Sequence, residues 1–267
     1  MKKILSIVLL FSLLLTPILP ESNAASTKIQ MDKCTVSVKK SFYYTGEGIT
    51  PTPKVSYKGK KLKKDRDFSV YYKDNMFVGT ATITLAGMGK YTGSTTVTFK
   101  IKKGKQTINA KNVKAVYGSE DINLSATSSG QTLLSYSSSK KSVATVSPVG
   151  VVSIKGVGTA EITIKAEGSK DLAAAKKTIT VKVSKAKPEI QAYGGIVKVG
   201  KKHDMRGSVN SGGKLTYKSS DKKIATVTKK GIVKTKKAGT VIITVKSTAT
   251  KNYKSGVKKV KVTVTNN

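Results

Sequence analysis

Two stretches of the chain share one pattern, and this pattern decides the fold. Residues 134–164 read LSYSSSKKSVATVSPVGVVSIKGVGTAEITI, and residues 215–245 read LTYKSSDKKIATVTKKGIVKTKKAGTVIITV. Extended to 134–183 and 215–264, the segments align without a gap at an offset of 81 residues, with 20 of 50 positions identical. Self-similarity at a fixed offset indicates an internal repeat of one small structural unit.

Inside each repeat, Val, Ile and Thr alternate between two faces, as in Ile162-Thr163-Ile164 and in residues 260–264, VKVTV. A period of two is typical of half-buried strands, and the glycines between the runs have the spacing of hairpin turns. Only residues 171–177, DLAAAKK, have a helical composition, for one or two turns. The sequence therefore predicts an all-β fold built from antiparallel β-sandwiches.

The 267 residues divide into a leader and three predicted modules. The repeats define a second module at 106–184 and a third at 187–265, each long enough for one small sandwich. A different β-rich pattern defines a first module at 27–102. The connecting segments at 102–106 and 184–188 are short, so we expect the tandem modules to form a semi-extended rod.

The repeated pattern Y-x-S-S-x-x-x-[VI]-A-T-V-x-x-x-G-[VI]-V-x-x-x-x-x-G-T-x-x-I-T-[IV] resembles the bacterial immunoglobulin-like domain of group 2. The resemblance implies tandem Ig-like sandwiches of the kind found in exported surface proteins and adhesins, and intimin and invasin proteins contain relatives. The first module, with Tyr44-Thr45-Gly46 and Asp65-Arg66-Asp67-Phe68, resembles another extracellular Ig-like repeat module of bacterial surface proteins.

Residues 1–24 have the organisation of a secretory signal peptide. A basic start precedes an apolar run from Ile4 to Leu15, and Ser22-Asn23-Ala24 offers the small residues that signal peptidase reads. The alternative is a transmembrane anchor, but a span needs about 20 apolar residues. We expect cleavage after Ala24 and a mature protein without a membrane span, either secreted or held noncovalently at the cell surface.

Few residues are candidates for catalysis or metal binding. A single Cys and a single His exclude an intrachain disulfide and any zinc cluster of several such ligands. We interpret His203 as a turn residue, because no nucleophile and oriented base accompany it in the sequence. Asp65 and Asp67 could bind calcium or act as acid and base, but they lack further clustered oxygens, so Asp67 is interpreted as a turn or strand-capping residue.

Two further features have structural interpretations. Gly87-Met88-Gly89 lacks the Lys-Ser/Thr of a phosphate-binding loop and is assigned to a hairpin. Cys34 is interpreted as a small buried strand residue rather than a reactive thiol or an intermolecular disulfide. We predict no catalytic residues, no cofactor, no bound metal and no enzymatic activity.

The net charge of +36 is concentrated in the third module, which has 20 basic and 3 acidic residues, against 10 and 5 in the second. A net charge of about 2–8 is sufficient for the solubility of a small domain. The excess predicts a surface that binds polyanions. The candidate residues are Lys222, Lys223, Lys229, Lys230, Lys234, Lys236, Lys237, Lys258, Lys259 and Lys261.

The expected partners are anionic cell-wall or matrix polymers, namely teichoic acid, polysaccharide or DNA. Lysine suits diffuse binding, and the scarcity of aromatic residues argues against sequence-specific recognition of nucleic acid. One alternative is that the lysines serve solubility and protect sheet edges. Two alternative functions are an adhesin that binds a specific host or bacterial surface protein, and an accessory module of a secreted enzyme system.

Overall fold

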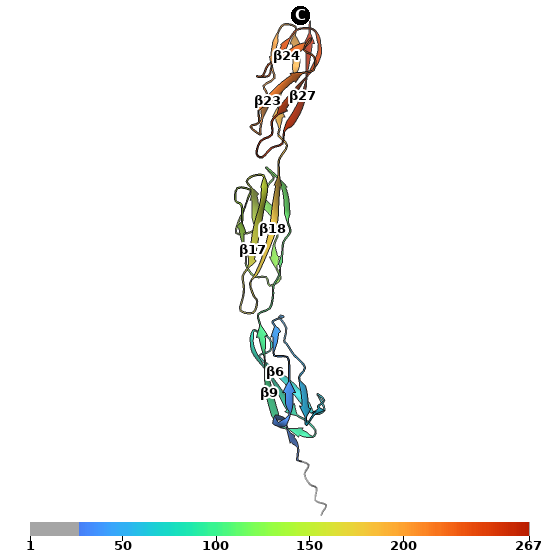
Figure 1. The fold of residues 1–267 in the computed structure, drawn as a ribbon, viewed down its shortest axis with the longest axis vertical. Helices are drawn as coiled ribbons and strands as arrows, with labels where there is room; N and C mark the ends of the chain where they lie inside the picture. Colours follow the sequence, from blue (N-terminus) through green and yellow to red (C-terminus); the bar gives the residue numbers. More distant parts are fainter. Residues whose placement is uncertain (1–26, 267) are drawn as a thin grey trace, which may run out of the picture. The chain divides into compact units, whose positions relative to one another are not determined.

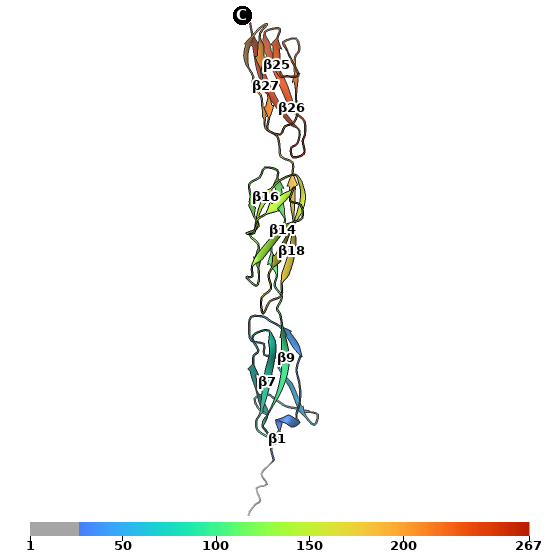
Figure 2. The same ribbon diagram turned by 90° about the vertical axis from the view of Figure 1, so that its left-hand side faces the viewer.

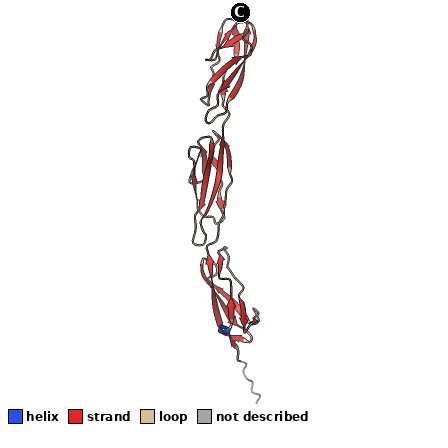
Figure 3. Cartoon of the chain, viewed as in Figure 1, coloured by secondary structure: helices blue, strands red, loops and turns tan. Residues whose placement is uncertain are grey.

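The computed structural model describes residues 27–266, so the predicted signal peptide lies outside the described part of the chain. Nearly all regular structure consists of strands, as Figure 3 shows, and the one helical element among the described residues is the 3₁₀ turn η1 (Met31–Lys33). The predicted all-β class is confirmed.

The helical expectation for residues 171–177 was wrong. Residues 171–174 form a loop, and residues 175–177 already belong to β18 (Ala175–Ser184), which pairs with β17 (Gly158–Ala166) along the whole length of β17. Figure 1 shows these two long strands side by side. A few alanines give only a weak local preference for a helix, and the long antiparallel ladder outweighs it.

In the second module, two sheets enclose a core. A four-stranded sheet has the order β11-β18-β17-β14, a three-stranded sheet has the order β12-β16-β15, and β10 pairs with β13. Their buried side chains, such as Val152, Ile162 and Val181, form one cluster. The further strands are β10 (Ile108–Asn109), β11 (Val113–Val116), β12 (Ile122–Asn123), β13 (Thr127–Ser128), β14 (Leu134–Ser138), β15 (Ala144–Val146) and β16 (Val151–Ile154).

The third module repeats this topology, with the sheets β20-β27-β26-β23 and β21-β25-β24 and the pair β19-β22. Figure 2 shows its long hairpin of β26 and β27. Val233, Ile243 and Val262 occupy its core. The strands are β19 (Ile190–Gln191), β20 (Gly195–Lys198), β21 (Lys202–Asp204), β22 (Ser208–Val209), β23 (Leu215–Ser219), β24 (Ala225–Val227), β25 (Ile232–Thr235), β26 (Gly239–Ser247) and β27 (Gly256–Thr265).

One glycine in each repeat explains part of the shared pattern. Gly150 and Gly231 end the turns before β16 and β25 with φ of +80° and +82°. A Cβ atom at these positions would lie 2.8 Å from Cζ of Tyr136 and 2.9 Å from Cζ of Tyr217. The turn therefore needs glycine both for its backbone conformation and for the ring that packs against it.

In the first module, a sheet of order β3-β9-β7-β6 and a sheet of order β2-β4-β5 are accompanied by a short parallel pair, β1-β8. Phe68, Ile83, Leu85 and Phe99 are buried. The strands are β1 (Ile29–Gln30), β2 (Thr35–Ser37), β3 (Ser41–Tyr43), β4 (Lys54–Tyr57), β5 (Lys60–Lys61), β6 (Phe68–Lys73), β7 (Gly79–Gly87), β8 (Tyr91–Thr92) and β9 (Ser94–Lys102).

The chain separates into two compact units. The described residues of the first unit are those up to Lys39, Thr50–Lys73 and Ala81–Phe99, and the second unit holds Lys40–Ile49, Asp74–Thr80 and the chain from Lys100 onward. The second and third modules both belong to the second unit. Across residues 27–266, no helix is long and apolar enough to cross a membrane.

Candidate polyanion-binding surface

Four of the ten predicted lysines lie in two neighbouring loops of the third module. Lys222 and Lys223 are in the loop from β23 to β24, and Lys236 and Lys237 are in the loop from β25 to β26. There, the backbone N–H groups of Lys236 and Lys237 donate to the carbonyl of Ile224, at 2.8 and 3.3 Å. These hydrogen bonds hold the two loops together, and all four lysines are exposed.

A third loop adds lysines that the sequence analysis missed. Lys198, Lys201 and Lys202 flank the turn between β20 and β21 and are exposed. The buried Thr235 hydroxyl shares its hydrogen between the carbonyl oxygens of Lys198 at 2.9 Å and Lys201 at 2.8 Å, so the turn is tied to the end of β25. Strand periodicity does not tell which loops meet, so the sequence held no signal for this grouping. We call the following seven residues the basic end: Lys198, Lys201, Lys202, Lys222, Lys223, Lys236 and Lys237.

The other predicted lysines lie outside these three loops, although one of them is next to the basic end. Lys229 and Lys230 form the turn between β24 and β25, and Lys234 is exposed on β25, paired across the sheet with Lys202. The predicted residues are therefore spread over loops and sheet faces.

Three predicted lysines belong to β27. Lys259 and Lys261 are exposed and alternate with buried valines, so they project from the outer face of the four-stranded sheet. Lys258 has the opposite phase and is half-buried, with its Nζ 5.9 Å from the centroid of the Tyr193 ring. Only part of the predicted set is thus brought together with the basic end.

The basic end has little negative charge nearby. Within the described part of the chain, the ion pairs are Lys64–Asp65 and Arg66–Asp67, both in the first module. Asp221 lies in the β23–β24 loop, where its Oδ1 accepts a hydrogen bond from the N–H of Lys223 at 2.7 Å. Seven ammonium groups and one carboxylate therefore give these loops a local charge of about +6, which attracts anions.

The matching loops of the second module are nearly neutral. Strand pairing aligns Lys198 with Val116 and Lys202 with Asp121, because β20–β27 and β21–β25 have the register of β11–β18 and β12–β16. Between these two aligned positions the second module is one residue longer than the third, and it contains Glu120 beside Asp121. Against these two acids stand three lysines, Lys140, Lys141 and Lys155, which leaves a local charge of about +1.

Asp67 has a structural role in the first module. Its Oδ2 accepts hydrogen bonds from the N–H of Lys63 and from Nη2 of Arg66, both at 2.7 Å, and its Oδ1 accepts one from Nε of Arg66 at 3.0 Å. The Arg66 guanidinium and the Lys63 N–H hold the pKa of Asp67 below its usual value. The carboxylate thus closes the turn before β6. Among residues 27–266, no three His, Cys, Asp or Glu side chains cluster as a metal site would require.

The remaining single-residue expectations have mixed outcomes. His203 lies within β21, so its assignment to a turn was wrong; its Nε2 is 2.9 Å from the carbonyl oxygen of Tyr193. Cys34 is half-buried and follows η1, immediately before β2, rather than lying inside a strand. Burial, with a smaller contribution from Asp32, raises the pKa of the Cys34 thiol, which lowers its reactivity.

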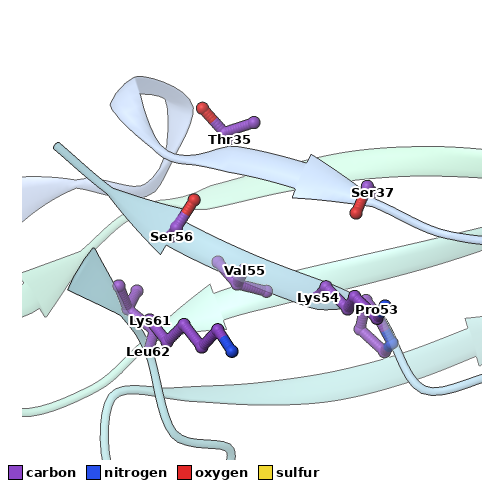
Figure 4. A pocket seen from close by; sticks show the side chains of 8 residues that line it. All are labelled: Thr35, Ser37, Pro53, Lys54, Val55, Ser56, Lys61 and Leu62. Carbon is purple, nitrogen blue, oxygen red and sulfur yellow. The ribbon is translucent and has the colours of Figure 1, made fainter. Parts of the chain in front are cut away.

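The first module has an open groove over its smaller sheet, of about 420 Å³. Figure 4 shows side chains from β2, β4 and β5 around it, including Thr35, Ser56 and Lys61. The floor is the buried Val55. The groove offers hydroxyl groups and two lysines, but no nucleophile paired with a base, so it has no recognisable catalytic arrangement.

Comparison with known proteins gives one match to a protein family. Residues 123–168 match the family model described as the immunoglobulin-like domain of intimin. This stretch runs from the end of β12 to just past β17, in the middle of the second module. None of the curated proteins matches the chain.

Several solved structures are similar at low identity. Drosophila N-cadherin EC1-4 is 13% identical over 89% of this chain and 73% of that one, with a TM-score of 0.32. Sidekick-1 immunoglobulin domains 1–5 are 12% identical over 88% and 59%, with a TM-score of 0.36. The surface layer protein SbsC, domains 1–6, is 16% identical over 87% and 40%, with a TM-score of 0.31. The chain spans less than two thirds of the latter two.

Proposed function

We propose that the chain is an exported, non-enzymatic surface or adhesion protein whose third module binds anionic polymers electrostatically. The match of the second module to the Ig-like domain of intimin supports a surface role. The observation that supports polymer binding is the basic end, in which three loops present seven exposed lysines and one carboxylate.

The chemistry of the basic end favours a polymer over a small anion. Each lysine is a compact, strongly hydrated charge that does not fix the geometry of its partner. An exposed charge pair contributes about 0.5 kcal/mol, so useful affinity requires many pairs on one ligand. Teichoic acid, anionic polysaccharide and DNA all supply a chain of charges, and their binding weakens as salt screens the attraction.

The test is sedimentation of the secreted chain, residues 25–267, with purified cell walls that contain or lack teichoic acid, over a range of salt concentrations. The variant K222Q/K223Q/K236Q/K237Q removes four charges from the basic end. We expect it to bind roughly 30-fold more weakly, from about 2 kcal/mol for four exposed pairs. A matched control, K141Q/K155Q/K165Q/K170Q, removes four exposed charges from the second module and should bind almost as well as the parent chain.

A rescue experiment separates position from total charge. Glu120→Lys with Asp121→Lys makes the second module resemble the third at the matching loops. Added to the basic-end variant, these changes should restore about half of the lost binding free energy. If the two quadruple variants bind equally, or if binding is saturable and insensitive to salt, the polyanion proposal is wrong and a specific protein partner becomes the better explanation.

A further inference from the structure

The third module has an open groove, and the polyanion proposal involves only one of its lining residues, Lys202. Its volume is about 720 Å³, and it lies against the segments around β19, β21 and the turn after β21. The lining residues are Gln191, Tyr193, Lys202, His203, Asp204 and Arg206. An aromatic ring, a guanidinium, an imidazole, a carboxylate, an amide and an ammonium group therefore surround one space.

The backbone of Tyr193 is fixed by two hydrogen bonds, and its side chain is exposed. The N–H of Tyr193 donates to the carbonyl of Met205 at 2.9 Å, and its own carbonyl is 2.9 Å from Nε2 of His203. Met205 is fully buried, so the segment is anchored in the core, while Tyr193 remains 54% exposed. The Lys258 Nζ lies 5.9 Å from the centroid of this ring, and the exposed remainder of the ring is a surface on which a ligand can stack.

Arg206 lines the same groove, and a local turn fixes its backbone. It adopts φ of +46°, and its N–H donates to Oδ1 of Asp204 at 2.8 Å. The chain has two arginines, and the other, Arg66, is paired with Asp67. Among the described residues no carboxylate forms an ion pair with Arg206, so its planar fork can take an anionic group of a ligand in bidentate geometry.

The second module has the same backbone there but different side chains. Ser125 has the same φ of +46°, and its N–H donates to Oδ1 of Asn123 at 2.8 Å, as Arg206 does to Asp204. By strand pairing, His203 corresponds to Ile122, and the ring of Tyr193 is replaced by Lys111. At these positions the aromatic, imidazole and guanidinium groups therefore occur in the third module and not in the second. The second module forms the same backbone without them, so the fold does not require them.

We propose that this groove binds an acidic sugar residue of a polysaccharide. The Tyr193 ring would stack on the pyranose, and the Arg206 guanidinium would take the carboxylate of a uronate or a sulfate ester. Lys202 adds positive charge, and Asp204 can accept hydrogen bonds from sugar hydroxyls. A phosphate backbone is less suitable, because its phosphate groups have no hydrogen-bond donor for the Asp204 carboxylate and are repelled by its charge.

This inference rests on the proposed function and names its ligand class, but it uses other residues. The basic end would attract a polymer through the sum of many weak charge pairs, whereas the groove would recognise one sugar unit. Lys202 belongs to both sets, so the experiment relies on Tyr193 and Arg206, which belong to the groove alone.

The test measures binding of the chain 25–267 to short oligosaccharides by calorimetry. The probes are tetragalacturonate, a sulfated neutral tetrasaccharide, an uncharged tetrasaccharide and inorganic polyphosphate. Tyr193→Ala should weaken binding of the acidic sugars about tenfold, because it removes the aromatic face on which the sugar ring stacks. Arg206→Lys keeps the charge but loses the fork, and should weaken it by a similar factor. Tyr71→Ala, which removes a ring 61% exposed in the first module, is the matched control.

The outcomes separate the two proposals. Polyphosphate binding should be unchanged in Tyr193→Ala and Arg206→Lys, and weakened in the basic-end variant. The carboxylated and sulfated probes, compared with each other, show which anionic group the groove prefers. If neither acidic tetrasaccharide binds, or both bind equally well to the parent chain and to both groove variants, the groove proposal is overturned. If the parent chain binds an acidic tetrasaccharide through Tyr193 and Arg206 but binds neither polyphosphate nor cell walls, the basic end is overturned and the groove is supported.

Discussion

The second and third modules have matching cores and different surfaces. The core positions Val152, Ile162 and Val181 correspond to Val233, Ile243 and Val262, and the pairing of the long strands is the same. By contrast, the loops that form the basic end change from a local charge of about +1 to about +6. Close packing makes a core position sensitive to a change in side-chain volume of one methylene group, whereas an exposed position tolerates almost any polar side chain. The surface is therefore where the two repeats could acquire different functions.

Substitution of the turn glycine in each module tests the matching cores, and we expect it to cause the largest loss of stability. Gly150→Ala and Gly231→Ala each place a Cβ within 3 Å of a tyrosine ring and force a left-handed residue. Strain of about 1–2 kcal/mol and overpacking of about 1–3 kcal/mol should destabilise each module by about 3 kcal/mol. Hydrogen exchange, read separately for each module, measures the loss.

Matched controls for these two variants are Gly118→Ala and Gly200→Ala. These glycines have φ of +84° and +78°, but a Cβ atom there meets nothing within 4 Å. The controls should lose only the strain contribution, about 1–2 kcal/mol. Equal losses in the turn glycines and their controls would mean that the tyrosine contact is not part of what the two modules share.

The second comparison concerns the start of each module, which is built differently. Gln106 is buried; its Nε2 donates to the carbonyls of Glu167 (2.7 Å) and Ala173 (2.8 Å), and its Oε1 accepts from the Thr132 hydroxyl (2.8 Å). The pairing of β10 and β19 aligns Gln106 with Pro188, which has no such side-chain bonds to make.

Gln106→Ala should therefore destabilise the second module by about 2–3 kcal/mol, because it leaves buried polar groups without partners. Pro188→Ala in the third module should cost less than about 1 kcal/mol, mainly through a more flexible unfolded chain. Chemical denaturation followed by module-resolved hydrogen exchange measures both. A loss below about 1 kcal/mol for Gln106→Ala would show that water replaces the amide without difficulty.

Gln106 also shows where sequence reasoning reaches its limit. The alternation of Val, Ile and Thr was enough to predict the strands and the all-β class, because a two-residue period follows from the strand backbone itself. A polar residue in a lysine-rich connection gave no sign that it would be buried, since its hydrogen-bond partners lie 26, 61 and 67 residues away. The same reason explains why Lys198, Lys201 and Lys202 were missed: the sequence shows charge, whereas only folding shows which loops meet.

The smallest expected effect concerns the two core tyrosines in alkali. Burial raises the pKa of both Tyr136 and Tyr217, and the negative charge of Asp204 raises that of Tyr217 further. A raised pKa means that the folded module holds the phenol proton more tightly than the unfolded chain. Its contribution to stability is complete below the ordinary tyrosine pKa of about 10 and is lost as pH rises through the higher folded value.

Asp204 is thus the one charge that separates the two tyrosines, because the second module has the neutral Asn123 at the same place. Asp204→Asn should lower the pKa of Tyr217 toward that of Tyr136, and tyrosinate absorbance titrated between pH 9 and 12 measures the change. Asn123→Asp should have the opposite effect on Tyr136. If neither substitution moves a titration, solvent screens this carboxylate from the ring, and the difference between the two modules lies in the loops alone.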